Sequence, residues 1–187
     1  MNAYTIALFL HIVGALGYFA TVGVLLVAVT RMRQATTTAA LREWAGLAAT
    51  TEQWVPANAV LLVLSGGYLV ITSEVWQAAW IVVALGMLVV FVPLFPFILG
   101  RRLNEIHNAT RTETSEEIPP VLARRIQDTV LLGTLRLVTA LSLGIVFLMT
   151  LKPDRTGSLV TVGITLILGL AIAFPTHRRY LRTAVAR

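Results

Sequence analysis

The chain opens with a long uncharged run, which from Tyr4 to Thr30 reads YTIALFLHIVGALGYFATVGVLLVAVT. These 27 residues contain no Asp, Glu, Lys or Arg, and the basic residues Arg31 and Arg33 follow them directly. At a rise of about 1.5 Å per residue, a helix of this length exceeds the roughly 30 Å hydrocarbon core of a bilayer. No basic segment precedes the run, so we expect a membrane-spanning helix here and not a cleaved signal peptide.

The composition of the whole chain agrees with a membrane protein. Of its 187 residues, 57% are hydrophobic and only 13% are charged, and the mean hydropathy is +0.80. Soluble domains have about a quarter charged residues. The net charge of +6 comes from basic residues between apolar runs, which argues against nucleic acid as a partner and for the lipid bilayer. The absence of Cys excludes disulfides and thiolate metal sites.

Four further runs are long and apolar enough to cross a membrane, although Arg136 interrupts one of them. The predicted fold is therefore all-α, a polytopic bundle that forms a single transmembrane domain over residues 1–187. Its five expected transmembrane helices cover about residues 4–30, 53–73, 76–100, 129–151 and 157–176.

The basic residues predict the orientation of this bundle. With five helices, one side of the membrane carries only Lys152 and Arg155. The other side carries twelve arginines, namely Arg31, Arg33, Arg42, Arg101, Arg102, Arg111, Arg124, Arg125, Arg178, Arg179, Arg182 and Arg187. Because basic residues near helix ends stay in the cytoplasm, we expect an N-out, C-in multi-pass protein of the bacterial cytoplasmic membrane.

The segments expected on the cytoplasmic side have helical patterns of their own. Residues 39–51 place Leu41, Trp44, Leu47 and Ala48 on one face, which predicts a short helix in the headgroup plane. Residues 104–117 read as a polar, acidic loop, and a helix is expected to start at the two prolines 119 and 120 and run unbroken into residues 129–151.

Two stripes of small residues predict helix packing faces, since close backbone approach holds helices together in lipid. They recur every third residue in the first helix and every fourth in the last, at Gly14, Gly17, Ala20 and Gly23 and at Thr161, Thr165, Gly169 and Ala173.

Arg136 is the one charge expected well inside a span, so it has to face protein or water. Asn58 lies at a similar depth, Glu52 stands about a turn and a half below it, and Pro93 and Pro96 leave carbonyl groups without a helical donor. An inner polar cluster of these groups has two interpretations. It is either an anion, lipid-headgroup or proton-pathway site, or a structural arginine that reaches the inner interface.

His11 is the only histidine within an expected span, near the outer edge of the hydrocarbon core. An imidazole there is a candidate ligand for haem iron or copper, with Met149 as a soft second ligand; the alternative is a polar residue bonded to a neighbouring helix. His107 and His177 are expected on the cytoplasmic side. No catalytic arrangement of residues is evident, so the sequence argues against an enzyme.

The stretch LFLHIVGALG, residues 8–17, resembles the first helix of a family of uncharacterised bacterial predicted integral membrane proteins. That family is itself similar to the copper-resistance D membrane domain and to the membrane protoporphyrinogen oxidases. The resemblance implies that His11 meets haem or a metal ion at the outer side. The oxidase-like relatives also use an intramembrane lysine, whereas the only lysine here is Lys152 in an expected outer loop, and the copper-type relatives have richer His and Met clusters.

The leading hypothesis is a small redox-accessory protein that binds haem b or copper through His11. One alternative is a small-solute or ion transporter that uses Arg136 and Asn58. Another is an assembly subunit, within a homo-oligomer or a larger membrane complex, that binds through its glycine stripes.

Overall fold

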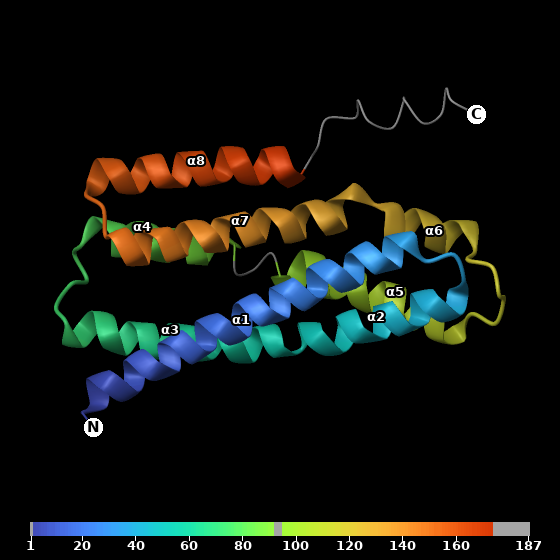
Figure 1. Ribbon diagram of the computed structural model, residues 1–187, viewed down its shortest axis with the longest axis horizontal. Helices are drawn as coiled ribbons and strands as arrows, with labels where there is room; N and C mark the ends of the chain where they lie inside the picture. The colour runs from blue at the N-terminus through green and yellow to red at the C-terminus, as the bar shows by residue number, and fades with distance from the viewer. Residues whose placement is uncertain (1, 92–94, 174–187) are drawn as a thin grey trace.

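The computed structural model describes residues 2–91 and 95–173, and this part of the chain is all helical (Figure 1). The predicted all-α membrane fold is confirmed. The elements are α1 (Ala3–Gln34), α2 (Thr38–Glu52), α3 (Trp54–Thr72), α4 (Ala79–Phe91), a π-helix η1 (Phe95–Gly100), α5 (Arg101–Thr112), α6 (Pro120–Gln127), α7 (Thr129–Leu151) and α8 (Arg155–Ala173).

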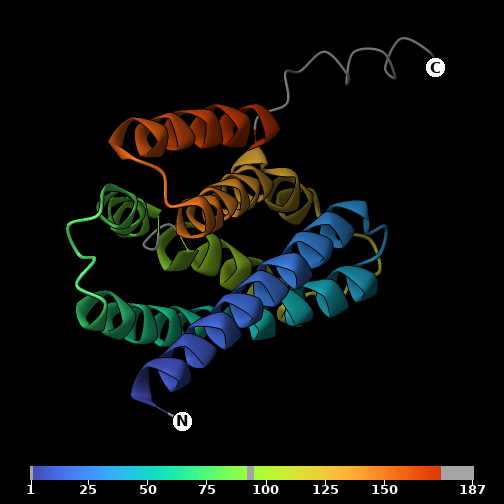
Figure 2. The same ribbon diagram turned by 60° about the vertical axis from the view of Figure 1, so that its left-hand side comes forward.

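The connections gather at two ends of the bundle. The N-terminus, the α3 to α4 connection and the α7 to α8 connection lie at the left end of Figure 1, while the α1 to α2 turn and the α5 to α6 connection lie at the right end. Figure 2 shows α1 crossing the other helices obliquely. Most arginines of residues 2–91 and 95–173 lie on the helices at the right end, so we call this end the inner end and the opposite one the outer end.

Several described helices have the length and polarity of membrane spans. Four helices or nearly continuous helix pairs contain an apolar stretch long enough to cross a membrane, over Ala3–Gln34, Thr38–Thr72, Pro120–Leu151 and Arg155–Ala173, and a shorter apolar helix covers Ala79–Val90. Their outward side chains are apolar: Leu16, Leu64, Ile71 and Ile167 are each at least two-thirds exposed. Such a surface needs lipid around it. The count of five spans and the N-out orientation stay predictions.

The tightest packing lies at the inner end. Leu25 and Met32 of α1, Leu41 of α2, Leu103 of α5 and Ile126 of α6 are almost completely buried in one cluster. Helices α1, α2, α5 and α6 therefore enclose a common core at this end of the bundle.

The headgroup-plane prediction for residues 39–51 is wrong. Helix α2 begins at the N-cap Thr37 and passes through Gln53, which has helical φ and ψ of −60° and −21°, almost directly into α3. Figure 1 shows the two helices in line. The reason is packing. Leu41, Ala45 and Ala48 are buried against α1 and α5, and this contact keeps α2 in line with α3.

The span expected at residues 76–100 begins later than predicted, and the helix continues past its expected end. Helix α4 begins at Ala79, η1 covers the stretch that holds Pro96, and α5 follows Gly100 without a turn. Pro93 lies outside the described residues. A proline cannot donate to the helical ladder, which accounts for the wider π-helical winding. Helix α5 replaces the start of the expected loop because Leu103 and Ile106 bury one face of it.

The helix expected to run unbroken through residue 128 is also interrupted. Asp128 has a ψ of 123°, which ends α6, and its carboxylate accepts a hydrogen bond from the Val130 N–H at 2.9 Å, which begins α7. Asp is a favourable N-cap because its side chain satisfies a free N–H of the first turn.

The small-residue stripes do form packing faces. A Cβ placed on Gly144 of α7 would lie 2.7 Å from Thr165 Oγ1 of α8, and one on Gly169 of α8 would lie 2.8 Å from Leu137 of α7. Gly14 and Gly17 meet α3 in the same way, whereas a Cβ on Gly23 would meet nothing within 4 Å. The stripe on α1 is thus a contact face along its outer part only.

We predict that Gly144→Ala destabilises the bundle by about 1 to 3 kcal/mol, because the added methyl forces apart two helices in contact. Gly163→Ala is the matched control, since nothing lies within 4 Å of its Cβ position. Thermal unfolding in mild detergent measures both variants. Equal unfolding temperatures would show that the α7 to α8 contact does not depend on Gly144.

Candidate functional site

His11 lies between α1 and α3 in the outer half of the bundle. Its ring is partly buried, and Nδ1 lies 3.2 Å from the carbonyl oxygen of Leu62 and 3.4 Å from Ser65 Oγ. A carbonyl oxygen only accepts hydrogen bonds, so Nδ1 carries the proton. In the neutral imidazole, Nε2 then keeps its lone pair, which is the form that ligates metals.

Gly66 of α3 makes room for the His11 ring. A Cβ at Gly66 would lie 2.9 Å from Cε1 and 3.1 Å from Nδ1 of His11, closer than packed atoms tolerate. A Cβ at the adjacent Gly67 would meet nothing within 4 Å. The two glycines look alike in sequence, so the contact between Gly66 and the His11 ring was not predicted.

Met149 lies on α7 toward the same end of the bundle as His11. Helices α1 and α7 meet where the Tyr18 hydroxyl bonds Ser142 Oγ at 2.9 Å, and His11 and Met149 each lie seven residues outward from that contact. The hydrogen bonds of His11 go to α3, while Met149 is partly buried against the hydrophobic core. Among the described residues, no group of three or more His, Asp or Glu side chains could hold a metal ion.

The residues of the expected inner polar cluster have separate neighbours. Arg136 Nη1 donates to the Ile172 carbonyl of α8 at 3.4 Å, and Asn58 Nδ2 donates to Thr21 Oγ1 of α1 at 3.2 Å. Glu52 lies against Gly100, where a Cβ would be 2.5 Å from its Oε1. The hydrogen bonds of the described residues therefore do not join Arg136 to Asn58 or Glu52.

Helix pairing explains why these residues do not meet. Helix α3 packs mainly against α1, and α7 packs mainly against α8, so side chains at equal depth on α3 and α7 face different partners. Each polar group bonds the helix beside it. This arrangement favours the structural interpretation of Arg136.

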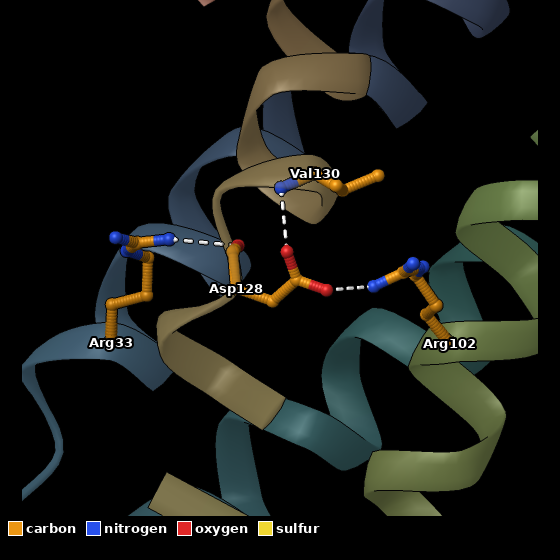
Figure 3. Close-up of polar contacts among 4 residues, drawn as sticks. All are labelled: Arg33, Arg102, Asp128 and Val130. Atoms are coloured by element: carbon orange, nitrogen blue, oxygen red, sulfur yellow. Dashed lines mark hydrogen bonds and ion pairs between the residues drawn. The ribbon is translucent and has the colours of Figure 1, made fainter. Parts of the chain in front are cut away.

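A polar junction that the sequence analysis missed lies at Asp128 (Figure 3). Its carboxylate pairs with Arg102 of α5, and its backbone carbonyl accepts from Arg33 Nη1 of α1 at 3.1 Å. The Val130 N–H, and after it the Arg102 and Arg33 guanidinium groups, lower the pKa of Asp128 below its ordinary value. Asp128 thus holds three helices together as a carboxylate. Its place directly before an apolar run was the available signal.

We predict that Asp128→Asn lowers stability at pH 7 by about 1 kcal/mol, because the amide keeps the cap but loses the partly exposed ion pair. We expect Asp128→Ala to lower the free energy of unfolding by about 1 kcal/mol more than Asp128→Asn does, since it removes the cap as well.

A depressed carboxylate pKa stabilises the fold above the unfolded pKa of about 3.9, and this contribution is lost as the pH falls through the folded value. The advantage of the wild type over Asp128→Asn therefore shrinks in unfolding experiments between pH 7 and pH 3. An advantage independent of pH would mean that the charge of Asp128 has no part in it.

The helical fold and apolar outer surface define a polytopic helical integral membrane protein. A family described as "Predicted integral membrane protein (DUF2269)" matches residues 5–153, and the chain belongs to this family. The match covers the region from α1 to α7, and α8 follows it. No curated protein and no solved structure matches the chain.

Proposed function

We propose that this chain is a haem-binding protein of the bacterial cytoplasmic membrane, with His11 as an axial ligand and a redox-accessory role. The observation that supports the proposal is the bond between His11 Nδ1 and the Leu62 carbonyl. Metal-ligating histidines typically donate their other ring N–H to a carbonyl or carboxylate, which orients the ring and strengthens the ligand.

The donor set fits haem better than copper. Haem supplies four nitrogen ligands of its own and needs only one or two axial ligands from the protein. A single oriented imidazole meets that need, with Met149 as the candidate for a second position. A copper site draws several ligands from the protein, and the described residues offer no group of three His, Asp or Glu side chains.

The residues around His11 would have defined tasks. Leu62 and Ser65 fix the ring orientation and tautomer, and Gly66 provides the space that the ring occupies. Exposed apolar side chains on the same helix, Phe9 and Ile12, face lipid and keep bulk water away. When bound, haem would supply one-electron transfer.

The transporter alternative needs Arg136 and Asn58 to line one path. Their hydrogen bonds lead to α8 and α1 respectively, so the residue contacts favour the haem proposal.

We predict that the protein, purified in mild detergent and supplied with haem, has a Soret band that His11→Ala abolishes. His107→Ala is the control, because His107 is also partly buried but lies on α5 at the inner end, against Gly46. Absorption spectra of both variants, with circular dichroism to check folding, give the result. A wild type that binds no haem, or a Soret band unchanged in His11→Ala, would refute the proposal.

We further predict that Gly66→Ala weakens haem binding about 10-fold or more, the usual effect of disturbing the residues that orient a ligand. Gly67→Ala is the control and should leave haem affinity unchanged, because nothing lies within 4 Å of its Cβ position. Haem titration compares the two affinities, and equal values would mean that the seating of His11 on Gly66 is irrelevant to binding.

A further inference from the structure

A polar cleft opens at the inner end of the bundle, independent of His11. Its volume is about 460 Å³, and it lies between η1 and α5 on one side and the junction of α6 and α7 on the other. Among its lining residues are Phe97, Arg101, Arg102, Arg125 and Asp128.

Three arginines and two carboxylates line this cleft, which leaves it with net positive charge. Arg101 pairs with Glu105 at 3.0 Å and Arg102 pairs with Asp128, while Arg125 adds a third positive charge. The side chain of Arg101 is 77% exposed, so its guanidinium can turn toward a ligand at little cost. Guanidinium groups bind phosphate oxygens in a bidentate manner, which makes a phosphate-containing anion the matching ligand.

The wall of the cleft points to a lipid as the source of that phosphate. Phe97 is 76% exposed and Ile98 is partly buried, and both belong to the segment that leads out of the apolar helix α4. Arginines therefore stand directly next to an outward apolar surface. A phospholipid has the same order of groups, a charged headgroup followed by acyl chains.

We propose that this cleft binds the headgroup phosphate of an anionic phospholipid, with Arg101, Arg102 and Arg125 around the phosphate and an acyl chain along Phe97. Basic pockets at the cytoplasmic ends of transmembrane helices are typical sites for anionic headgroups. In the predicted orientation the cleft faces the leaflet in which the positive-inside arginines lie.

The test compares lipid binding by the full chain in detergent, measured by native mass spectrometry with dioleoyl-phosphatidylglycerol and with dioleoyl-phosphatidylcholine. We expect tighter binding of phosphatidylglycerol. The double variant Arg101→Gln/Arg125→Gln should lose this preference, at roughly fivefold in affinity per arginine. Arg111→Gln/Arg124→Gln is the control, because it removes the same charge from exposed positions of α5 and α6 that are not among the lining residues.

A variant that binds more tightly distinguishes a specific effect on lipid binding from a loss of binding caused by misfolding. Glu105→Gln removes a carboxylate from the cleft and should tighten phosphatidylglycerol binding roughly fivefold. Glu43→Gln, on the exposed face of α2, should leave it unchanged.

Three outcomes would overturn the assignment. The first is an equal affinity of the wild type for the two lipids. The second is an equal loss of phosphatidylglycerol affinity in the two double variants. The third is displacement of phosphatidylglycerol by inorganic phosphate at the same concentration, which would identify a site for the free anion.

Discussion

The fold depends on one constraint, which is that lipid offers no hydrogen bonds to a polar group. Helices satisfy their own backbone groups, and the polar side chains in the apolar part of the bundle find partners within the protein. Several Ser and Thr hydroxyls donate to the carbonyl one turn earlier in their own helix, and other polar groups bond an adjacent helix. Tyr18 meets Ser142, Asn58 meets Thr21, and His11 meets the carbonyl of Leu62. The bonds of Asn58 and His11 join α1 to α3, two helices that also approach each other closely at Gly14 and Gly17.

The inner end of the bundle packs in a different way. There the helices α1, α2, α5 and α6 bury leucine, isoleucine and methionine side chains as a soluble bundle does. Charged side chains there connect helix ends through ion pairs and hydrogen bonds. Asp128 joins three helices, and Arg42 donates to the carbonyls of Thr110 and Glu113, where α5 ends. Positive charge at a helix C-terminus is favourable.

Hydropathy was sufficient to predict the all-helical membrane fold, since uncharged runs such as residues 4–30 have little alternative in lipid. It failed where the helices leave the apolar region. The continuation of α2 into α3, the path from η1 into α5 and the break at Asp128 all depend on which faces pack together, and periodicity within one helix does not carry that information.

The same limit applies to the candidate residues. Their rarity within apolar runs singled out His11, Asn58 and Arg136, but depth along a helix was an insufficient guide to their partners. Asn58 and Arg136 lie at similar depths and still face α1 and α8. Gly66 shows the limit most clearly, because only the position of the His11 ring distinguishes it from Gly67.

His11 and Arg136 make the same kind of contact, a bond to a backbone carbonyl of an adjacent helix, with opposite chemical consequences. Arginine has donors only and keeps its charge, so a single carbonyl contact neutralises nothing and leaves no atom able to bind a metal. Histidine has a neutral form, and when its Nδ1–H donates a hydrogen bond to the carbonyl, the lone pair of Nε2 remains available. Within the apolar bundle, a carbonyl contact therefore leaves Arg136 a charged donor, whereas the same contact leaves a neutral His11 with one ring nitrogen that still has a lone pair.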